Sequence, residues 1–249
     1  MTALHSLISQ GVEAVKRTLF LRYCLVGEHP LQDSERLLCE ECLQSLPALP
    51  LPQIPYGWDP NSSPLDGALS YWEFSPSLQR LIHELKYRRK PLIGELLGAY
   101  LARGMEISLL PGADLLIPVP LHPVRQRERG YNQAAAIARG MSSVLDVPVQ
   151  ETVLHRQRYT ATQTALSRQE RRNNLLGAFD ISAPGMELIQ GKNILLVDDV
   201  FTTGATSEAA AQVLKAGGVH LVCAITLASA SLESQGSADP SIQVEGRAP

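Results

Sequence analysis

Two hydrophobic rhythms divide this chain into strands and helices. Largely apolar runs predict strands at 68–74, 114–118, 193–197 and 219–227, with a shorter one beginning at 153, and those at 114–118 and 193–197 are expected to be buried. Apolar residues spaced three and four apart predict helices, at 4–21, 77–87, 92–105, 132–145 and 207–216. Asn132 stands where it would cap the fourth of these helices. Because strands alternate with helices, the sequence predicts an α/β fold with a mostly parallel sheet flanked by helices.

The first part of the chain differs from the rest in its cysteine and proline content. Three of the four cysteines lie in a short, polar, turn-rich segment at 22–46, and residues 47–67 are rich in proline. The proline-rich composition predicts a linker or an irregular wrap. We therefore expect an N-terminal helix and a cysteine-containing, zinc-finger-like head at 1–46, the linker at 47–67, the main domain at 68–230 and a disordered tail at 231–249.

Composition narrows the classes of protein to consider. The 249 residues are 45% hydrophobic and 19% charged, which is enough to bury a core and remain soluble. A net charge of -3 argues against a protein that coats nucleic acid by charge alone, so such a contact would need a local basic patch. The sequence contains no run of about 18 apolar residues, so no membrane-spanning helix is expected. The N-terminal pattern is not that of a signal peptide. The expected location is cytoplasmic, where reduced cysteines suit a metal site better than disulfides.

The strongest chemical signal is the segment 194–206, in which an apolar strand leads into two acids, a hydroxylated loop and a helix. Backbone N–H groups at a helix N-terminus bind phosphate, and the helix dipole favours an anion there. A glycine in the loop permits close approach or positive φ. The predicted phosphate-binding residues are Thr202, Thr203, Gly204, Ala205 and Thr206.

Asp198 and Asp199 need a separate reason, because carboxylates beside a phosphate pocket repel the ligand's charge. They suit a ligand that also carries sugar hydroxyls, whose hydrogen bonds they would accept. They would also stabilise the positive charge that develops on a ribose when pyrophosphate leaves C1. The alternative is a plain strand–turn–helix whose acids cap the helix, but the order of acids, loop and helix favours the ligand site.

Residues 194–206 resemble the motif by which type I phosphoribosyltransferases bind 5-phosphoribosyl-1-pyrophosphate (PRPP), and the wider chain, over roughly 20–228, resembles the ComF family. Further matching segments are Leu85-Lys86-Tyr87, 117–122 leading into 129–133, and the stretch from Thr162 to Phe179. The resemblance implies a type I phosphoribosyltransferase fold and transfer of a phosphoribosyl group between PRPP and an unknown acceptor, with Mg²⁺. It also implies an association with DNA uptake in natural transformation.

The resemblance assigns further site residues. With Asp198 and Asp199 as catalytic acids, Gln163 and Arg168 are catalytic candidates on a mobile lid that also holds Arg171. The expected pyrophosphate-binding residues are Leu121, His122, Arg125, Arg129 and Lys86. Arginine suits this role because its planar fork grips two phosphate oxygens. For the lid arginines a solvated charged face is the alternative, and for His122 a surface histidine.

Cys39 and Cys42 have the two-residue gap of a zinc knuckle, and Cys24 lies upstream at a plausible distance. The ComF family has a second cysteine three residues after the first, where this chain has Gly27. The zinc site is therefore three-ligand, completed by another residue such as His29, or lost. Cys223 lies in an apolar run and is expected to be a core residue.

Three functions remain open at this point. The chain is a phosphoribosyltransferase, a non-catalytic protein that binds PRPP, a nucleotide or single-stranded DNA, or a metal-dependent interaction protein whose head docks a partner. Arg88, Arg89 and Lys90 form a basic run that would contact a nucleic-acid backbone or simply face solvent.

Overall fold

The computed structural model describes residues 22–50, 54–104, 112–157, 175 and 177–230. The chain divides into two compact units, Met1–Leu46 and Pro47–Pro249. The predicted N-terminal helix, the lid candidates Gln163, Arg168 and Arg171, and the predicted tail lie outside the described residues. No helix in the described ranges has both the length and the apolar character that crossing a membrane requires.

The described part of the first unit is a short loop followed by one helical turn. Tyr23 and Pro30 form an isolated antiparallel bridge, and the backbone N–H of Cys24 donates to the carbonyl of His29 at 2.9 Å. Helix α2 (Glu40–Gln44) follows, and the Cys39 thiol caps it by accepting from the N–H of Cys42. The cysteines thus lie at the two points where this segment turns.

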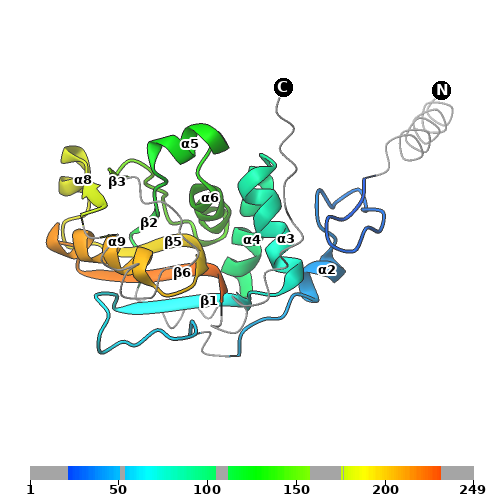
Figure 1. The fold of residues 1–249 in the computed structure, drawn as a ribbon, viewed down its shortest axis with the longest axis horizontal. Coiled ribbons are helices and arrows are strands. Elements are labelled where there is room, and N and C mark those ends of the chain that lie inside the picture. The colour runs from blue at the N-terminus through cyan, green and yellow to red at the C-terminus, as the bar shows by residue number, and fades with distance from the viewer. Residues whose placement is uncertain (1–21, 51–53, 105–111, 158–174, 176, 231–249) are drawn as a thin grey trace, which may run out of the picture. The chain divides into compact units, whose positions relative to one another are not determined.

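The second unit is built on a parallel four-stranded sheet with the order β1-β6-β5-β2 (Figure 1). The strands are β1 (Gly67–Glu73), β2 (Leu115–Pro118), β5 (Asn193–Phe201) and β6 (Leu221–Ser229). Each is largely buried, as expected for parallel strands covered on both faces. The predicted mostly parallel sheet flanked by helices is confirmed.

Six helices of this unit are described, and two further short strands form an antiparallel pair, β3 with β4. The helices are α3 (Pro76–Tyr87), α4 (Pro91–Gly104), α5 (Pro123–Arg129), α6 (Gln133–Leu145), α8 (Ala183–Leu188) and α9 (Ala205–Ala216); the short strands are β3 (Leu154–Arg156) and β4 (Phe179–Ile181). The apolar side of α9 packs with β3, β4 and alternate residues of the sheet in one core cluster. The predicted cap is confirmed, because Asn132 accepts from the N–H of Ala134 at 3.0 Å.

The described part of the proline-rich segment lies along β1. The N–H of Leu49 donates to the carbonyl of Tyr71 at 2.9 Å, and Ala48 forms a bridge with Trp72. Trp72 is fully buried and stacks on Tyr100, with 5.7 Å between the ring centroids. These residues wrap the edge of the sheet that β1 would otherwise expose.

Two sequence predictions about the region of the site need correction. Strand β5 was expected to end at Val197, but it continues to Phe201, so both acids lie within the strand. Arg125 and Arg129 lie on α5, a helix that the sequence analysis did not predict. Helix α9 also begins two residues earlier than expected, at Ala205.

Candidate functional site

The acid pair lies near the carboxyl end of β5, in the part of the strand that pairs with β6. Asp198 is in register with Thr226, which holds the backbone of the pair in the sheet. Asp199 is buried, and its backbone N–H donates to Asp198 Oδ1 at 2.8 Å. The carboxyl ends of parallel strands are where open α/β sheets place their ligands. The two carboxyl groups are therefore fixed at a ligand-binding edge.

Two basic side chains from other elements face this pair. Lys86, at the end of α3, places Nζ 2.7 Å from Asp199 Oδ2. Arg156, at the end of β3, interacts electrostatically with Asp198, and its guanidinium carbon lies 5.6 Å from the centre of the Phe179 ring. Burial lowers the pKa of Arg156, while the charge of Asp198 raises it. The chain itself thus supplies cations to a crowded pair of acids.

Desolvation, together with the neighbouring charge of Asp199, raises the pKa of Asp198 to about 7. The N–H of Asp199, Lys86 and Arg156 act in the opposite direction, because each favours the carboxylate. A carboxyl group that titrates near neutrality can exchange a proton or accept hydrogen bonds from a ligand's hydroxyls at physiological pH. Perturbed pKa values of this kind are common at functional sites.

The loop after β5 forms the N-terminus of α9. Gly204 is the N-cap residue with φ 77°, in the left-handed region, and α9 has no side-chain cap hydrogen bond. A Cβ at this position would come within 2.6 Å of the Phe201 ring, so a larger residue has neither the conformation nor the space. Thr203 is buried, Thr202 is exposed and Thr206 is half-buried. This helix start, open at its cap, has the geometry that binds phosphate.

The segment after β2 leads into α5. His122 is the N-cap of that helix, and its Nδ1 accepts from the N–H of Val124 at 3.3 Å. Leu121 precedes it and is half-buried. Arg125 forms an exposed ion pair with Glu128 at 3.2 Å. His122 and Arg125 therefore border the end of β2, which neighbours β5 in the sheet.

Three segments from which the site was predicted, 85–87, 129–133 and 194–206, meet at the end of α3. The Tyr131 hydroxyl donates to the carbonyl of Leu85, and Arg129 lies over the Tyr87 ring with 5.5 Å from its guanidinium carbon to the ring centre. Arg129 also donates to Gln133. Through Lys86 and Asp199, the same helix end contacts β5. The structure thus joins α3, the turn between α5 and α6, and the acid pair.

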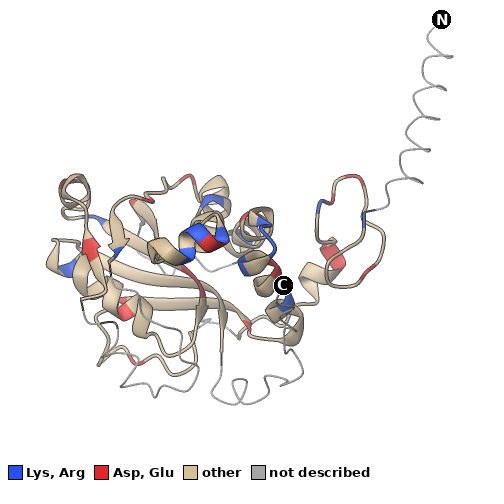
Figure 2. Ribbon diagram, turned by 45° about the horizontal axis from the view of Figure 1, so that its top comes forward, with Lys and Arg blue, Asp and Glu red and all other residues tan. Residues whose placement is uncertain are grey.

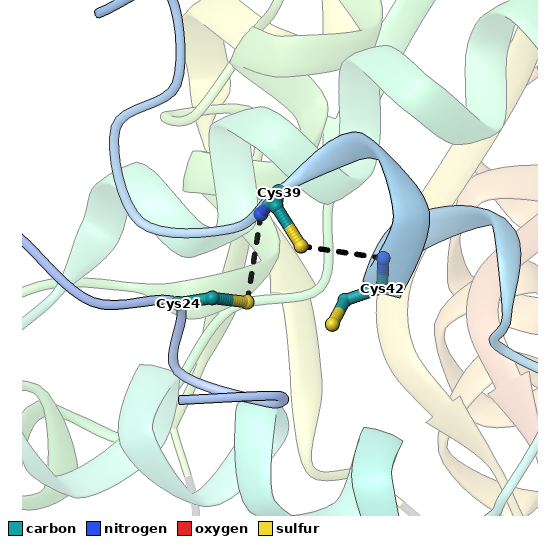
Figure 3. A group of neighbouring side chains, drawn as sticks. All are labelled: Cys24, Cys39 and Cys42. Atoms are coloured by element: carbon teal, nitrogen blue, oxygen red, sulfur yellow. Dashed lines mark hydrogen bonds between the residues drawn. The ribbon is translucent and has the colours of Figure 1, made fainter. Parts of the chain in front are cut away.

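The second cluster of chemically active side chains lies in the head. Cys24, Cys39 and Cys42 are buried, and their sulfur atoms all lie within 4.8 Å of one another (Figure 3). The N–H of Cys39 donates to Cys24 Sγ at 3.5 Å, and the N–H of Cys42 donates to Cys39 Sγ at 3.4 Å. His29 Nε2 lies 3.2 Å from Cys42 Sγ. This cluster could hold a metal ion.

The thiols of the head differ in how readily they ionise. Burial opposes ionisation of Cys24, but hydrogen bonds from the N–H groups of Gly27, Cys39 and Val26 outweigh it and lower the pKa of that thiol. Burial, together with the neighbouring thiols of Cys24 and Cys39, raises the pKa of Cys42 to about 12. A bound metal cation would instead lower the pKa of Cys42, since metal coordination deprotonates a thiol.

The chain matches the phosphoribosyl transferase domain family over residues 131–241. The DNA utilization protein YhgH of Escherichia coli O157:H7 is 34% identical over 192 residues, which cover 75% of this chain and 75% of that protein. Competence protein F of Haemophilus influenzae is 39% identical over 107 residues, or 43% of this chain and 46% of that protein. Competence protein ComFC of Bacillus subtilis is 34% identical over 116 residues, or 45% of this chain and 43% of that protein.

The chain belongs to the ComF family. Membership agrees with the expected fold class, a type I phosphoribosyltransferase fold with a small N-terminal cysteine-containing head. A glutamine PRPP amidotransferase from B. subtilis, complexed with ADP and GMP, aligns at 21% identity with a TM-score of 0.36, over 57% of this chain and 26% of that chain. A likeness at that level carries no argument about function.

Within this ComF chain, sequence reasoning missed Arg156 as a residue facing the acids. The signal was its position as the first arginine of an arginine-rich stretch, two residues after the apolar pair Val153-Leu154 that begins a strand. It missed Tyr131 as the residue that holds α3 in place, although Tyr131 lies within a ComF-type segment. Cys223 is buried in β6, as expected for a core residue.

Proposed function

We propose that this protein binds PRPP and transfers its phosphoribosyl group to an acceptor. The observation that carries the proposal is the pair Asp198 and Asp199 in β5, joined by a short loop to the uncapped start of α9. One ligand that needs both features is a ribose with a 5-phosphate and a leaving group at C1. The acids accept from the ribose hydroxyls, and their charge stabilises the sugar cation as pyrophosphate departs.

In this proposal, each group of residues binds one part of the ligand. The 5-phosphate binds at the start of α9, through backbone N–H groups and the hydroxyl groups of Thr202, Thr203 and Thr206. The pyrophosphate binds beside the end of β2. His122 caps the start of α5 there, Arg125 lies in its first turn and Arg129 is its last residue. Gln163 and Arg168 remain lid candidates on the strength of the family resemblance.

The acid pair is compatible with Mg²⁺, because carboxylate and phosphate oxygens are the ligands that this ion prefers. Lys86 Nζ is 2.7 Å from Asp199 Oδ2, so Asp199 already has a cationic partner supplied by the chain. We therefore propose that Mg²⁺ is held mainly by oxygens of the bound PRPP, where it neutralises the charge of the leaving pyrophosphate.

Calorimetric titration with PRPP and Mg²⁺ tests the pocket. The double variant Asp198→Asn, Asp199→Asn should lose binding, because an amide cannot match the charge of a carboxylate facing the ribose. The control is Asp146→Asn with Glu151→Gln, which removes two exposed acidic charges away from β5. Equal affinity in the wild type and the acid-pair variant contradicts the site. Pyrophosphate release with candidate acceptors then tests turnover.

A second candidate function is binding of single-stranded DNA, and one surface favours it. Tyr87 is 62% exposed and lies against the His83 ring, with 4.8 Å between centroids, while Arg129 lies over it. Basic residues gather on α5 (Figure 2). An exposed aromatic ring among cations is a stacking platform for unpaired bases. Two relatives carry names that refer to DNA utilization and to competence.

Fluorescence anisotropy with a labelled oligo(dT) tests this surface. Tyr87→Ala should weaken binding by about 10-fold, because stacking contributes about 1–3 kcal/mol per base. Tyr56→Ala is the control, since Tyr56 is a 40% exposed tyrosine on the same unit. Identical affinities for the two variants exclude Tyr87 as a platform. PRPP binding that survives Tyr87→Ala would separate the two functions.

For the head, we propose a structural Zn²⁺ held by Cys24, Cys39, Cys42 and His29. A tetrahedral zinc site with bonds of about 2.3 Å places sulfur ligands roughly 3.8 Å apart. The sulfur atoms of these cysteines all lie within 4.8 Å of one another, so a small movement would bring them to that spacing. A Cβ on Gly27 would overlap the His29 ring and come within 2.8 Å of Cys42 Sγ. The absence of a side chain at 27 thus makes room for the imidazole, which completes four ligands of the kinds that zinc prefers.

A further inference from the structure

Lys86 is the basic residue of the 86–90 run that faces into the candidate site. Its Nζ lies 2.7 Å from Asp199 Oδ2, and the two side chains are 25% and 8% exposed. An ion pair this sheltered from water is more strongly coupled than a surface pair. Lys86 and Asp199 therefore form one electrostatic unit rather than two independent groups.

The neighbouring basic residues are engaged elsewhere. Lys90 Nζ lies 2.8 Å from Glu84 Oε2, and Arg88 Nε lies 3.9 Å from Glu84 Oε1. Glu84 thus serves as the acidic partner for the outer part of the run. Lys86 differs from Lys90 in its partner, which makes Lys90 a matched control for the loss of a lysine charge.

The end of α3 is anchored, so Lys86 projects from a fixed point. Leu85 is fully buried, and its carbonyl accepts from the Tyr131 hydroxyl. Tyr87, on the other side of Lys86, is exposed, with the Arg129 guanidinium carbon 5.5 Å from its ring centre. Both residues that flank Lys86 in sequence are therefore held by the turn between α5 and α6. Side chains locked in this way are what a preorganised site requires.

The acid pair needs a cation to remain fully charged. Two adjacent carboxyl groups repel each other, and one of them tends to keep its proton. The charged groups that face Asp198 are Asp199 from its own strand, Lys86 from α3 and Arg156 from β3. Lys86 makes the close contact with Asp199, and Arg156 acts on Asp198. Each acid thus has its own basic partner.

We propose that Lys86 is a positioning residue, which holds Asp199 as an oriented carboxylate for the ribose hydroxyls and does not itself bind the pyrophosphate. This inference rests on the proposed PRPP site and replaces the role that the family resemblance suggests for Lys86. The ammonium group fixes one carboxylate oxygen of Asp199 and favours the ionised form of Asp198. The consequence is that Lys86 affects the sugar end of the ligand and not its leaving group.

Two fragments of PRPP, tested separately, distinguish positioning of Asp199 by Lys86 from binding of the pyrophosphate by Lys86. Ribose 5-phosphate lacks the pyrophosphate, and pyrophosphate lacks the sugar. Lys86→Met should weaken ribose 5-phosphate by about 10-fold at pH 7, which corresponds to the loss of about 1.4 kcal/mol of interaction. Pyrophosphate affinity should stay within about twofold of wild type, because the charge of Lys86 is already paired with Asp199. Weaker pyrophosphate binding with unchanged ribose 5-phosphate affinity overturns the proposal.

The pH dependence of ribose 5-phosphate affinity and its rescue by Lys86→Arg are further measurements, which would not change if Lys86 had a purely structural role. In Lys86→Met, the affinity for ribose 5-phosphate should recover as pH rises from 7 to 9, since Asp198 then loses its proton without help from the lysine. Lys86→Arg should behave as wild type over this range, and Lys90→Met should leave both ligands unaffected. A loss of affinity in Lys86→Met that is constant with pH contradicts the positioning role.

A measurement without ligand keeps the inference testable if PRPP does not bind. Carbon-13 NMR of labelled aspartate follows the carboxyl of Asp198, whose pKa the charge of Lys86 lowers. Lys86→Met should move its titration to higher pH, and Lys90→Met should not. An unchanged titration rejects the role of Lys86. Failure of the wild type to bind PRPP, with the shift observed, rejects the proposed function instead.

Discussion

The acid pair in β5 and the thiol cluster of the head are both crowded groups of ionisable side chains, but their charges are balanced in different ways. At the acid pair, the chain supplies Lys86 and Arg156 as cations. At the thiols, the groups that shift ionisation are backbone N–H groups and other thiols. A site of the first kind is complete before its ligand arrives. A site of the second kind could take its balancing charge from a bound metal ion.

Metal removal should produce the largest difference between the two regions. Binding of structural zinc supplies on the order of 10 kcal/mol to a small domain, so a chelator should unfold the head. Hydrogen exchange should show amides at 24–44 losing protection while those of β5 and β6 keep theirs. Zinc content of the purified protein is measured alongside. Full protection of the head in a metal-free sample would break the comparison.

The fit between Gly27 and His29 provides the next test. Gly27→Ala should weaken zinc binding by about 10-fold or more, because the added Cβ overlaps the imidazole that completes the ligand set. Gly27→Cys with His29→Ala should restore four donors and tight binding. Competition with a chromophoric chelator measures both. Gly112→Ala is the control, since nothing lies within 4 Å of a Cβ there.

The start of α9 provides a test in the region of the acid pair, whose geometry, unlike that proposed for the cysteine head, needs no metal. Gly204→Ala should lower the free energy of unfolding by about 1–3 kcal/mol, since alanine is strained at φ 77°. Gly177→Ala is the matched control, with φ 67° and open space around its Cβ. The difference between the two urea midpoints reports the overlap with Phe201. Equal midpoints would mean that Phe201 gives way without cost.

The smallest expected effect is the pH dependence that Asp198 adds to stability. Its pKa of about 7 in the folded protein lies above the ordinary value of 3.8. The folded state therefore binds the proton more tightly, and the stability from this group is lost as pH rises from about 4 to 7. Asp198→Asn should flatten that part of the urea-midpoint profile. A profile that is the same in the variant would place the titration elsewhere.

Contiguous features of the site could be predicted from the sequence, whereas contacts between distant segments could not. The acids, the hydroxylated loop and the helix start follow one another along 198–206, so their order alone indicates a shared edge of the sheet. The partner of Lys86 lies on another element, and no local pattern identifies it. The same holds for the contact between Tyr131 and Leu85.

The errors in element boundaries also have physical causes. Helix α5 has no buried residues, so its sequence carries no apolar period for pattern analysis to detect. Aspartate is disfavoured in strands, which is why β5 was expected to stop before the acids. Pairing of Val200 with Ala228 and of Phe201 with Ser229 continues the strand regardless. For β5, tertiary context thus overrode local preference.

The burial of Trp72 against Tyr100 has a spectroscopic consequence. The chain has two tryptophans, Trp72 in β1 and Trp58, which packs against the core of the second unit, and none precedes residue 47. Their emission therefore reports on the phosphoribosyltransferase-type unit and is silent about the cysteine head. A melting curve followed by intrinsic fluorescence would look intact in a sample that had lost its metal, so the two halves of this chain need two different reporters.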